Sequence, residues 1–329
     1  MAEHHNQPGA DAGSIEEGLA LAAQMQSNGR LGEAESIYRR ILQVDPSQPV
    51  ALHRLGILAH QAGHSGVAVD LIKAAIACVP DYVAAHNNLG NVYREMGRLD
   101  EAIDSYRQAI AIKPDYFEAC NNLGLCLTLQ QQFDAAADSF RQAIAIQPDF
   151  PDPHNNLGNV LTRQHRLEEA VSCFRSAIAR RPAFTEAHTN LGVVLKNLGR
   201  LDAAADSFRQ AIASQPDFAD PYNKLGTTLQ KMGQLEEAIG SYRQAIAINP
   251  RFAGAYCNLA NALEQQGRLE EAIASYRQAL TIQPDNAEAA GSLGSALLRL
   301  GQLEEGLAME QKGFGVITFD LERGVTVDR

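Results

Sequence analysis

Residues 83–116 read VAAHNNLGNVYREMGRLDEAIDSYRQAIAIKPDY, and this stretch decides the fold because its pattern recurs along most of the chain. Its proline and its leucine each return at a constant interval of 34 residues, and glycine follows the leucine in every case except Ala260. The chain is therefore an array of one repeated unit. The prolines are Pro46, Pro80, Pro114, Pro148, Pro182, Pro216, Pro250 and Pro284, and the leucines are Leu55, Leu89, Leu123, Leu157, Leu191, Leu225, Leu259 and Leu293.

Stepping this unit in both directions predicts about nine repeats, the last of them incomplete. Residues 1–14 are polar and contain Gly, Asn and Pro, so we expect a disordered N-terminal tail. Residues 311–329 include β-branched residues in two short extended runs around LERG, which predicts a C-terminal cap or the start of a further segment. The predicted repeats are 15–48, 49–82, 83–116, 117–150, 151–184, 185–218, 219–252, 253–286 and the incomplete 287–310.

Each repeat predicts two helices. The first ends near a glycine such as Gly97, a residue suited to a helix end, and the second ends at the next proline, which cannot continue a helix. Asp115 and its equivalents follow that proline, and we expect them to cap the next first helix. Gly90 and Ala102 alternate with the large Tyr106, as close packing of facing helices requires. The sequence therefore predicts an all-α solenoid of helix-turn-helix repeats.

These residues resemble the tetratricopeptide repeat family. The match covers roughly residues 15–310, and about eight positions agree over seven repeats. The resemblance implies a right-handed superhelix whose first helices line a concave groove. The aromatic residue usual near the start of the repeat is replaced by histidine or cysteine at His86, Cys120, His154 and His188. The terminal repeats depart from the pattern, as expected where the end of a solenoid faces water.

Composition narrows the class of protein further. A formal charge of −11 and a pI near 5.3 oppose a general nucleic-acid or anionic-membrane binder, because both depend on clustered Lys and Arg. The sequence contains neither a signal peptide nor an apolar run long enough to span a membrane. Its five cysteines lack CxxC spacing, so neither a disulfide framework nor a zinc site is indicated. We expect a cytoplasmic protein with no nucleic-acid or membrane partner.

The sequence contains no Gly-rich phosphate loop, nucleophile elbow or metal-ligand pair at helical spacing. His86, His154 and His188 lie in different repeats, and helices pack roughly 8 to 10 Å apart, so they are too distant to share a metal ion. We expect no enzyme activity, no cofactor and no metal site.

Two columns of asparagine distinguish the first helices. One column stands immediately before the repeat leucine and the other stands two residues after it. Three residues separate the columns, so both lie on one helix face about one turn apart. The first column, the asparagine ladder, contains Asn88, Asn122, Asn156, Asn190 and Asn258 and is interrupted by Lys224, and the second contains Asn91, Asn159 and Asn261.

The asparagine ladder has two interpretations. Its amides either hydrogen-bond neighbouring groups and satisfy the contact between repeats, or they offer donors and acceptors to the backbone of an extended peptide. The column resembles the asparagine ladder in the repeat domain of the O-linked N-acetylglucosamine transferases. That resemblance implies binding of substrate-protein backbone, but it covers only the repeat half of those enzymes, so transferase activity is not carried over.

Four cations, Arg94, Arg163, Lys196 and Lys231, lie about one turn beyond the ladder. If they face the groove together with Lys224, the groove presents a basic strip to acidic peptides or to a C-terminal carboxylate. The alternative is an ordinary solvated helix face.

Three functions follow from this pattern. The first is a non-enzymatic scaffold that binds extended protein segments in the groove. The second is the substrate-recruiting N-terminal region of a larger enzyme, such as a glycosyltransferase of the resembling family, motivated by the strand-like end of the chain. The third is a scaffold that assembles with itself, since open-ended solenoids stack.

Overall fold

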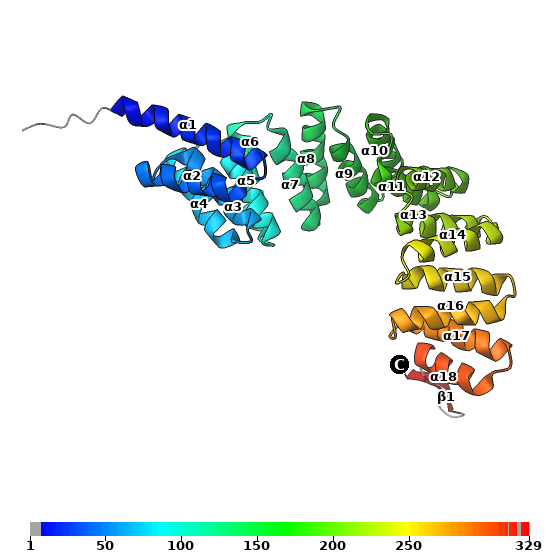
Figure 1. Cartoon of the computed structure of the whole chain (residues 1–329). Helices are drawn as coiled ribbons and strands as arrows, with labels where there is room; N and C mark the ends of the chain where they lie inside the picture. Colours follow the sequence, from blue (N-terminus) through cyan, green and yellow to red (C-terminus); the bar gives the residue numbers. More distant parts are fainter. Residues whose placement is uncertain (1–7, 315, 321–323, 329) are drawn as a thin grey trace, which may run out of the picture. The chain divides into compact units, whose positions relative to one another are not determined.

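The computed structural model describes residues 8–314, 316–320 and 324–328. The chain divides into two compact lobes, the N-terminal lobe (1–164) with α1–α9 and the C-terminal lobe (165–329) with α10–α18, β1 and β2 (Figure 1). The helices are α1 Pro8–Ser27, α2 Leu31–Val44, α3 Pro49–Gln61, α4 Ser65–Cys78, α5 Val83–Glu95, α6 Leu99–Ile112, α7 Phe117–Leu129, α8 Phe133–Ile146, α9 Pro151–Arg163, α10 Leu167–Arg180, α11 Thr185–Asn197, α12 Leu201–Ser214, α13 Ala219–Lys231, α14 Leu235–Ile248, α15 Ala253–Gln265, α16 Leu269–Ile282, α17 Ala287–Arg299 and α18 Leu303–Phe314, and the strands are β1 Val316–Asp320 and β2 Gly324–Asp328.

The all-α repeat fold is confirmed: the helices follow one another in pairs, and the first helices from α3 onward begin at the 34-residue interval. Two boundaries differ from those expected. Helix α1 begins at Pro8, so residues 8–14 of the expected tail are helical, consistent with proline at the first helical position; residues 1–7 lie outside the described part. Helix α18 continues past residue 310 to Phe314.

After α18 the fold type changes. Strands β1 and β2 pair antiparallel, with Val316 opposite Asp328 and Asp320 opposite Gly324. The two extended runs expected around LERG therefore form one hairpin, and residues 321–323 between them lie outside the described part.

The predicted helix ends are correct at their glycines and wrong at their aspartates. Gly97 has φ +74°, in the left-handed region that glycine adopts without strain. Gln131 and His165 take the equivalent place with φ 60°. Asp115, however, lies in the turn one residue before the N-cap Tyr116, too early for its carboxylate to cap α7.

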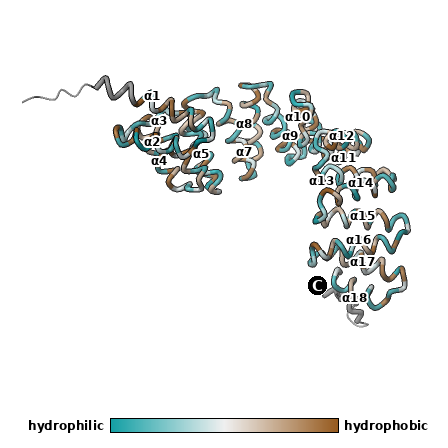
Figure 2. The backbone as a smooth tube through the Cα atoms, in the orientation of Figure 1, coloured by the Kyte–Doolittle hydropathy of each residue, from teal (hydrophilic) through white to brown (hydrophobic). Residues whose placement is uncertain are grey.

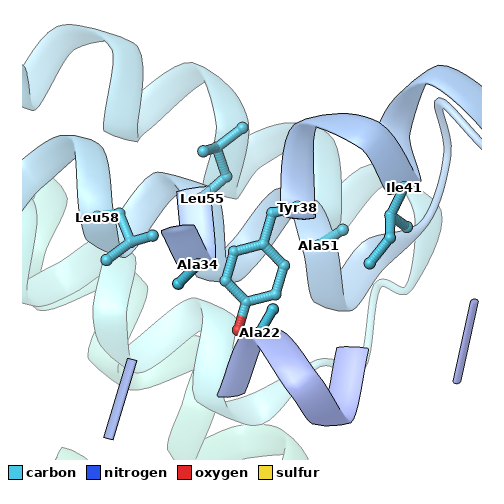
Figure 3. Packing of buried hydrophobic residues seen from close by; sticks show 7 residues of the cluster. All are labelled: Ala22, Ala34, Tyr38, Ile41, Ala51, Leu55 and Leu58. Atoms are coloured by element: carbon cyan, nitrogen blue, oxygen red, sulfur yellow. The ribbon is translucent and has the colours of Figure 1, made fainter. Parts of the chain in front are cut away.

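The core of most repeats is a large side chain packed against a small residue, usually glycine, on the first helix. A Cβ atom on Gly124 would lie 2.6 Å from the Phe140 ring, so only glycine allows α7 and α8 to approach this closely. Figure 3 shows the equivalent place in the first repeat, where the Tyr38 ring packs among Ala22 and Ala34. Hydrophobic and hydrophilic stretches alternate along the repeat helices in Figure 2, and the buried residues of these helices are mainly hydrophobic.

The first helices of neighbouring repeats also contact one another, in the pairs α3 with α5, α5 with α7 and α7 with α9 in the N-terminal lobe, and α11 with α13 and α13 with α15 in the C-terminal lobe. Among the described residues, no two second helices contact each other as extensively. Long side chains link them instead: Arg243 on α14 lies 3.2 Å from Glu271 on α16. The first helices thus form the more closely packed side of each lobe, which we call the inner face.

Candidate functional site

The asparagine ladder forms hydrogen bonds between repeats. In the N-terminal lobe, Asn122 Nδ2 donates to Asn87 Oδ1 and to Asn91 Oδ1, both at 3.2 Å. Asn156 Nδ2 donates to Asn121 Oδ1 of the preceding repeat at 3.3 Å. The partner residue stands one place before the ladder, so each ladder amide reaches back 35 residues. We call this chain of contacts the amide relay.

The relay begins at a histidine in the N-terminal lobe. Asn88 Nδ2 lies 2.9 Å from His53 Nε2, and because an amide nitrogen can only donate, Nε2 accepts. His53 Nδ1 therefore carries the ring proton and donates to the Tyr82 hydroxyl at 3.0 Å. The His53 side chain is buried, and burial, followed by the charge of Arg54, lowers its pKa from 6.5 to about 4. His53 is thus a neutral acceptor.

The C-terminal lobe forms the relay hydrogen bond between one pair of repeats but not between the pair before it. Asn258 Nδ2 donates to Asn223 Oδ1 at 2.9 Å. One repeat earlier the ladder position is Lys224, whose Nζ pairs with Asp220 on the same helix at 3.0 Å. The residue one place before the ladder in α11 is Thr189, whose hydroxyl donates to the Thr185 carbonyl.

The second asparagine column receives hydrogen bonds from buried tyrosines. Tyr106 Oη donates to Asn91 Oδ1 at 2.8 Å, and Tyr276 Oη donates to Asn261 Oδ1. Desolvation of the buried Tyr106 phenol raises its pKa, so the hydroxyl remains a donor. Phenylalanine takes the tyrosine place at Phe140, where the column holds Leu125, and at Phe174, where it holds Asn159. Asn91 and Asn261 therefore also satisfy a buried hydroxyl, while Asn159 is half-buried.

The relay uses the side-chain nitrogen atoms of the ladder asparagines as donors. The side-chain oxygen atoms of three of these residues remain available as acceptors. Among the described residues, Oδ1 of Asn122, Asn156 and Asn258 accepts no hydrogen bond. All three side chains are only half-buried. The inner face therefore presents a row of amide oxygens whose orientation is fixed by the relay.

Hollows in the inner face coincide with the asparagine columns. In the N-terminal lobe, a hollow of about 410 Å³ is lined by Asn88, Asn91 and Arg94 together with His60 and Glu95. The His60 Nε2 lies 2.8 Å from Glu95 Oε2, so these two side chains join α3 to α5 at its edge.

Hollows are also present in the described part of the C-terminal lobe. One of about 510 Å³ is lined by Gln230, Asn261, Glu264, Gln265 and Arg299, and there Arg299 pairs with Glu264 at 2.6 Å. Another, of about 200 Å³, includes Asn258 and Asn261 in its lining.

The predicted cations lie in different surroundings. Arg94 lines the N-terminal hollow. Lys196 is half-buried and its Nζ donates to Thr227 Oγ1 on α13 at 3.3 Å. Arg163 and Lys231 are exposed, and Asn190 of the ladder is half-buried.

The histidines that replace the usual aromatic residue have a structural contact in common. His86, His154 and His188 each place Nε2 within 2.9 Å of the carbonyl of the proline six residues earlier. This hydrogen bond ties the start of the first helix to the loop before it. Within the described part of the chain, no group of three or more His, Cys, Asp or Glu residues is arranged to hold a metal ion.

Sequence reasoning missed the acceptors of the relay. Asn87 is 5% exposed, and its place in the repeat is polar in several units, at His53, Asn121 and Asn223. Polar residues recur at this place at the 34-residue interval, and this recurrence could have predicted the acceptors. It indicates that the polar group has a partner in each such repeat.

The geometry defines a helical-repeat solenoid whose inner face carries polar side chains at regular intervals. Tetratricopeptide repeat family models match residues 155–219 and 223–287, a TPR repeat model matches 90–130 and 126–165, and a further tetratricopeptide model matches 71–104. Together they cover more than half of the chain. The chain belongs to the tetratricopeptide repeat proteins, and its fold is that of a protein-interaction scaffold.

Solved structures share the fold at low sequence identity. The APC/C hetero-tetramer Cut9–Hcn1 is 18% identical with a TM-score of 0.56, over 81% of this chain and 52% of that one. YrrB, described as a TPR protein with an unusual peptide-binding site, is 24% identical with a TM-score of 0.49, over 56% of this chain and 95% of that one. MamA is 23% identical with a TM-score of 0.48, over 49% of this chain and 95% of that one. No curated protein sequence matches the chain.

The sequence predicted no segment long and apolar enough to span a membrane. Over the described residues, every helix is too short or too polar to span a bilayer.

Proposed function

We propose that the inner face binds extended protein segments and that the protein is a non-enzymatic interaction scaffold. The observation that carries this proposal is the row of ladder oxygens left as acceptors once the amide nitrogens are engaged between repeats. An extended peptide presents backbone N–H groups as donors. Recognition of this kind depends on the main chain, so many sequences can bind.

The spacing of repeats suits an extended chain. Neighbouring helices pack roughly 10 Å apart, and an extended peptide advances about 3.3 Å per residue, so each repeat spans about three peptide residues. Four first helices of the N-terminal lobe, α3, α5, α7 and α9, therefore accommodate a peptide of about twelve residues. The ladder atoms predicted to bind it are those of Asn88, Asn122 and Asn156, flanked by Arg94.

The test uses arrayed random peptides of about twelve residues, followed by fluorescence anisotropy on the strongest binder with the full chain. Substituting both Asn122 and Asn156 with Ala removes two acceptors and is expected to weaken binding about tenfold or more. The same variant also loses inter-repeat bonds, so it needs a control for stability.

The matched control is the double variant Asn87→Ala and Asn121→Ala, which removes two of the three inter-repeat bonds from their acceptor side and keeps both ladder residues. We expect it to lose less affinity than the ladder variant, because both ladder oxygens remain, at a temperature where all three proteins are folded. Equal losses in both double variants would show that the ladder acts through structure only. N-methylation of the peptide at alternate residues removes its donors and should weaken binding in the parent protein.

A second candidate is that these repeats recruit substrates for a larger enzyme, such as a transferase of the O-linked N-acetylglucosamine type. The observation favouring it is the β1–β2 hairpin, which changes the fold type directly after α18. The open reading frame beyond Arg329 tests it: a nucleotide-sugar-binding domain there supports the candidate, and a stop codon directly after Arg329 opposes it.

A third candidate is self-association. Leu303 and Leu307 on α18 are 62% and 60% exposed, an apolar surface on the last helix of the array. Light scattering over a dilution series tests this candidate, since a constant monomer mass at every concentration excludes it. As part of the main proposal we place the protein in the cytoplasm, where an exposed thiol such as that of Cys78 stays reduced.

A further inference from the structure

A cluster of lysines interrupts the amide relay in the C-terminal lobe. Lys196 on α11 reaches across to α13, where its Nζ donates to Thr227 Oγ1 at 3.3 Å. Lys224 and Lys231 stand three residues before and four residues after Thr227, so both share its helix face. We call Lys196, Lys224 and Lys231 the lysine cluster. Two adjacent first helices thus bring three ammonium groups to one region of the inner face.

The lysine cluster has an excess of positive charge. Its one paired carboxylate is Asp220, 3.0 Å from Lys224, so two of three charges lack a counter-ion within ion-pair distance among the described residues. This region is opposite in sign to the chain as a whole, which carries −11. Burial, and then the charges of Lys231 and Lys224, lower the pKa of Lys196. The free protein therefore holds the three charges together at a cost that an anion would relieve.

The surroundings limit where that anion can bind. Toward the C-terminus, the next hollow contains Glu264, already paired with Arg299 at 2.6 Å. Beside the cluster, the half-buried Thr227 hydroxyl accepts from Lys196 and donates to the Lys224 carbonyl at 2.9 Å. The ammonium groups are therefore the donors available to an anion.

We propose that the lysine cluster binds one phosphoryl dianion carried by a protein segment on the inner face of the C-terminal lobe, such as phosphoserine or phosphothreonine. This inference rests on the proposed peptide-binding function and adds to it the chemistry of one side chain. A phosphoryl group carries about −1.5 to −2 charges at pH 7 and three strong acceptor oxygens. It matches the two unpaired ammonium groups, whereas a carboxylate supplies a single charge. The segment would thus be fixed in register at α11 and α13.

A peptide bound at α3, α5, α7 and α9 lies on the N-terminal lobe, so the experiment repeats the array with phosphoserine in every peptide and takes the strongest binder. Its Ser, phosphoserine and Glu forms, with the residue placed in turn at each position, are then compared against the full chain. At one position we expect phosphoserine to bind roughly tenfold more tightly than Ser, with Glu between them. The gain should fall as salt is added. No gain at any position overturns the inference and leaves the peptide-binding function standing.

Two matched double variants distinguish binding at the lysine cluster from general attraction by positive charge. Lys196→Gln with Lys231→Gln should abolish the phosphoserine gain and leave Ser-peptide binding unchanged. Lys73→Gln with Lys113→Gln removes the same charge from the N-terminal lobe and should keep the gain. If both pairs lose it equally, the effect is general attraction and the inference is wrong.

A last measurement does not depend on any peptide. Acetylation of individual lysines by a dilute reagent is followed by mass spectrometry with and without inorganic phosphate. Phosphate should slow modification of Lys196 relative to Lys73 and Lys113. If no peptide binds but phosphate protects Lys196, the proposed function fails and the anion site stands; equal rates at all three lysines exclude the site.

Discussion

The inner faces of the two lobes are built from the same repeat position but differ in chemistry. In the N-terminal lobe, Asn88, Asn122 and Asn156 each donate to the preceding repeat. In the C-terminal lobe the relay contains Asn258, but Lys224 takes the ladder place one repeat earlier and pairs within its own helix. Because a solenoid sets equivalent residues side by side, one substitution changes the chemistry at one defined point along the groove.

The comparison also shows that one residue type can have two roles at once. An asparagine has separate donor and acceptor groups, so its nitrogen holds the repeats together while its oxygen remains available. A lysine at the same place has donors only. It gives up the contact between repeats and adds charge, which favours specificity for an anion over tolerance of many sequences.

The largest expected difference between the lobes is in how their stability changes at low pH. The pKa of His53 is about 4 in the folded protein and 6.5 when unfolded, so its contribution to stability is complete above pH 6.5. It is lost as pH falls from 6.5 to 4, by about 3 kcal/mol at most. Hydrogen exchange, corrected for intrinsic rates, should show α3 and α5 losing protection over this range while α13 and α15 change less.

The control for this prediction is His53→Asn, which installs the residue found at the same place in the next two repeats, Asn87 and Asn121. Its Oδ1 still accepts from Asn88, but the group does not titrate. The acid sensitivity of α3 and α5 should disappear. If it persists unchanged, another group is responsible.

The relay itself is tested by removing one acceptor from each lobe. Asn87→Ala takes one of two acceptors from Asn122, and Asn223→Ala takes the acceptor from Asn258. Asn223→Ala should lower the free energy of unfolding by about 1 to 2 kcal/mol, since a half-buried donor loses its partner. Asn87→Ala should lower it by less, because Asn122 keeps its bond to Asn91. Urea titrations followed by circular dichroism measure the loss. Losses below the experimental error in both variants would mean that the relay contributes nothing to cohesion.

Among the described residues, a positive φ outside glycine occurs at Gln131 and His165, and relieving it should raise stability by a smaller amount. Gln131 has φ 60° where other repeats have glycine, so Gln131→Gly should stabilise the N-terminal lobe by about 0.5 to 1 kcal/mol. Gly199→Gln, at the equivalent place with φ +75°, should destabilise the C-terminal lobe by a similar amount. Thermal melting of both variants gives the sign; a lower melting temperature for Gln131→Gly contradicts the strain argument.

The smallest effect on stability is expected from Lys224→Asn, which would make the two lobes alike. It removes an ion pair between side chains about one-third exposed, worth about 0.5 kcal/mol or less. The new amide faces Thr189, so little is regained. Stability should stay nearly constant while the phosphoserine gain declines. A large loss of stability would instead show that Lys224 is chiefly a structural residue.

Much of this architecture could be predicted from the sequence because the period is exact in both proline and leucine. Prolines and glycines act on local backbone geometry, so the helix bounds followed from them. The N-caps did not, since Asp115 lies one residue too early for a capping bond. The start of α1 at Pro8 was missed because polar composition outweighed helix-start chemistry.

The candidate site was harder to predict, because its contacts join residues in different repeats. The columns showed which residues share a face, but not that Asn122 bonds to Asn87, nor that Lys196 reaches Thr227. Such partners depend on the lateral offset between first helices, which the period alone does not fix. The second column also had an unnoticed companion in sequence, the tyrosine at Tyr106 and Tyr276 that donates to it.

The 35-residue reach of the relay has a consequence for the length of the array. Asn87 and Asn121 hold equivalent acceptors, so excising residues 117–150 would bring Asn156 opposite Asn87 with the same donor and acceptor atoms. The relay joins only adjacent repeats and treats them as interchangeable. A chain shortened by this repeat would therefore re-form the amide contact without any compensating substitution, so the number of repeats can vary by recombination wherever both neighbours carry the relay asparagines.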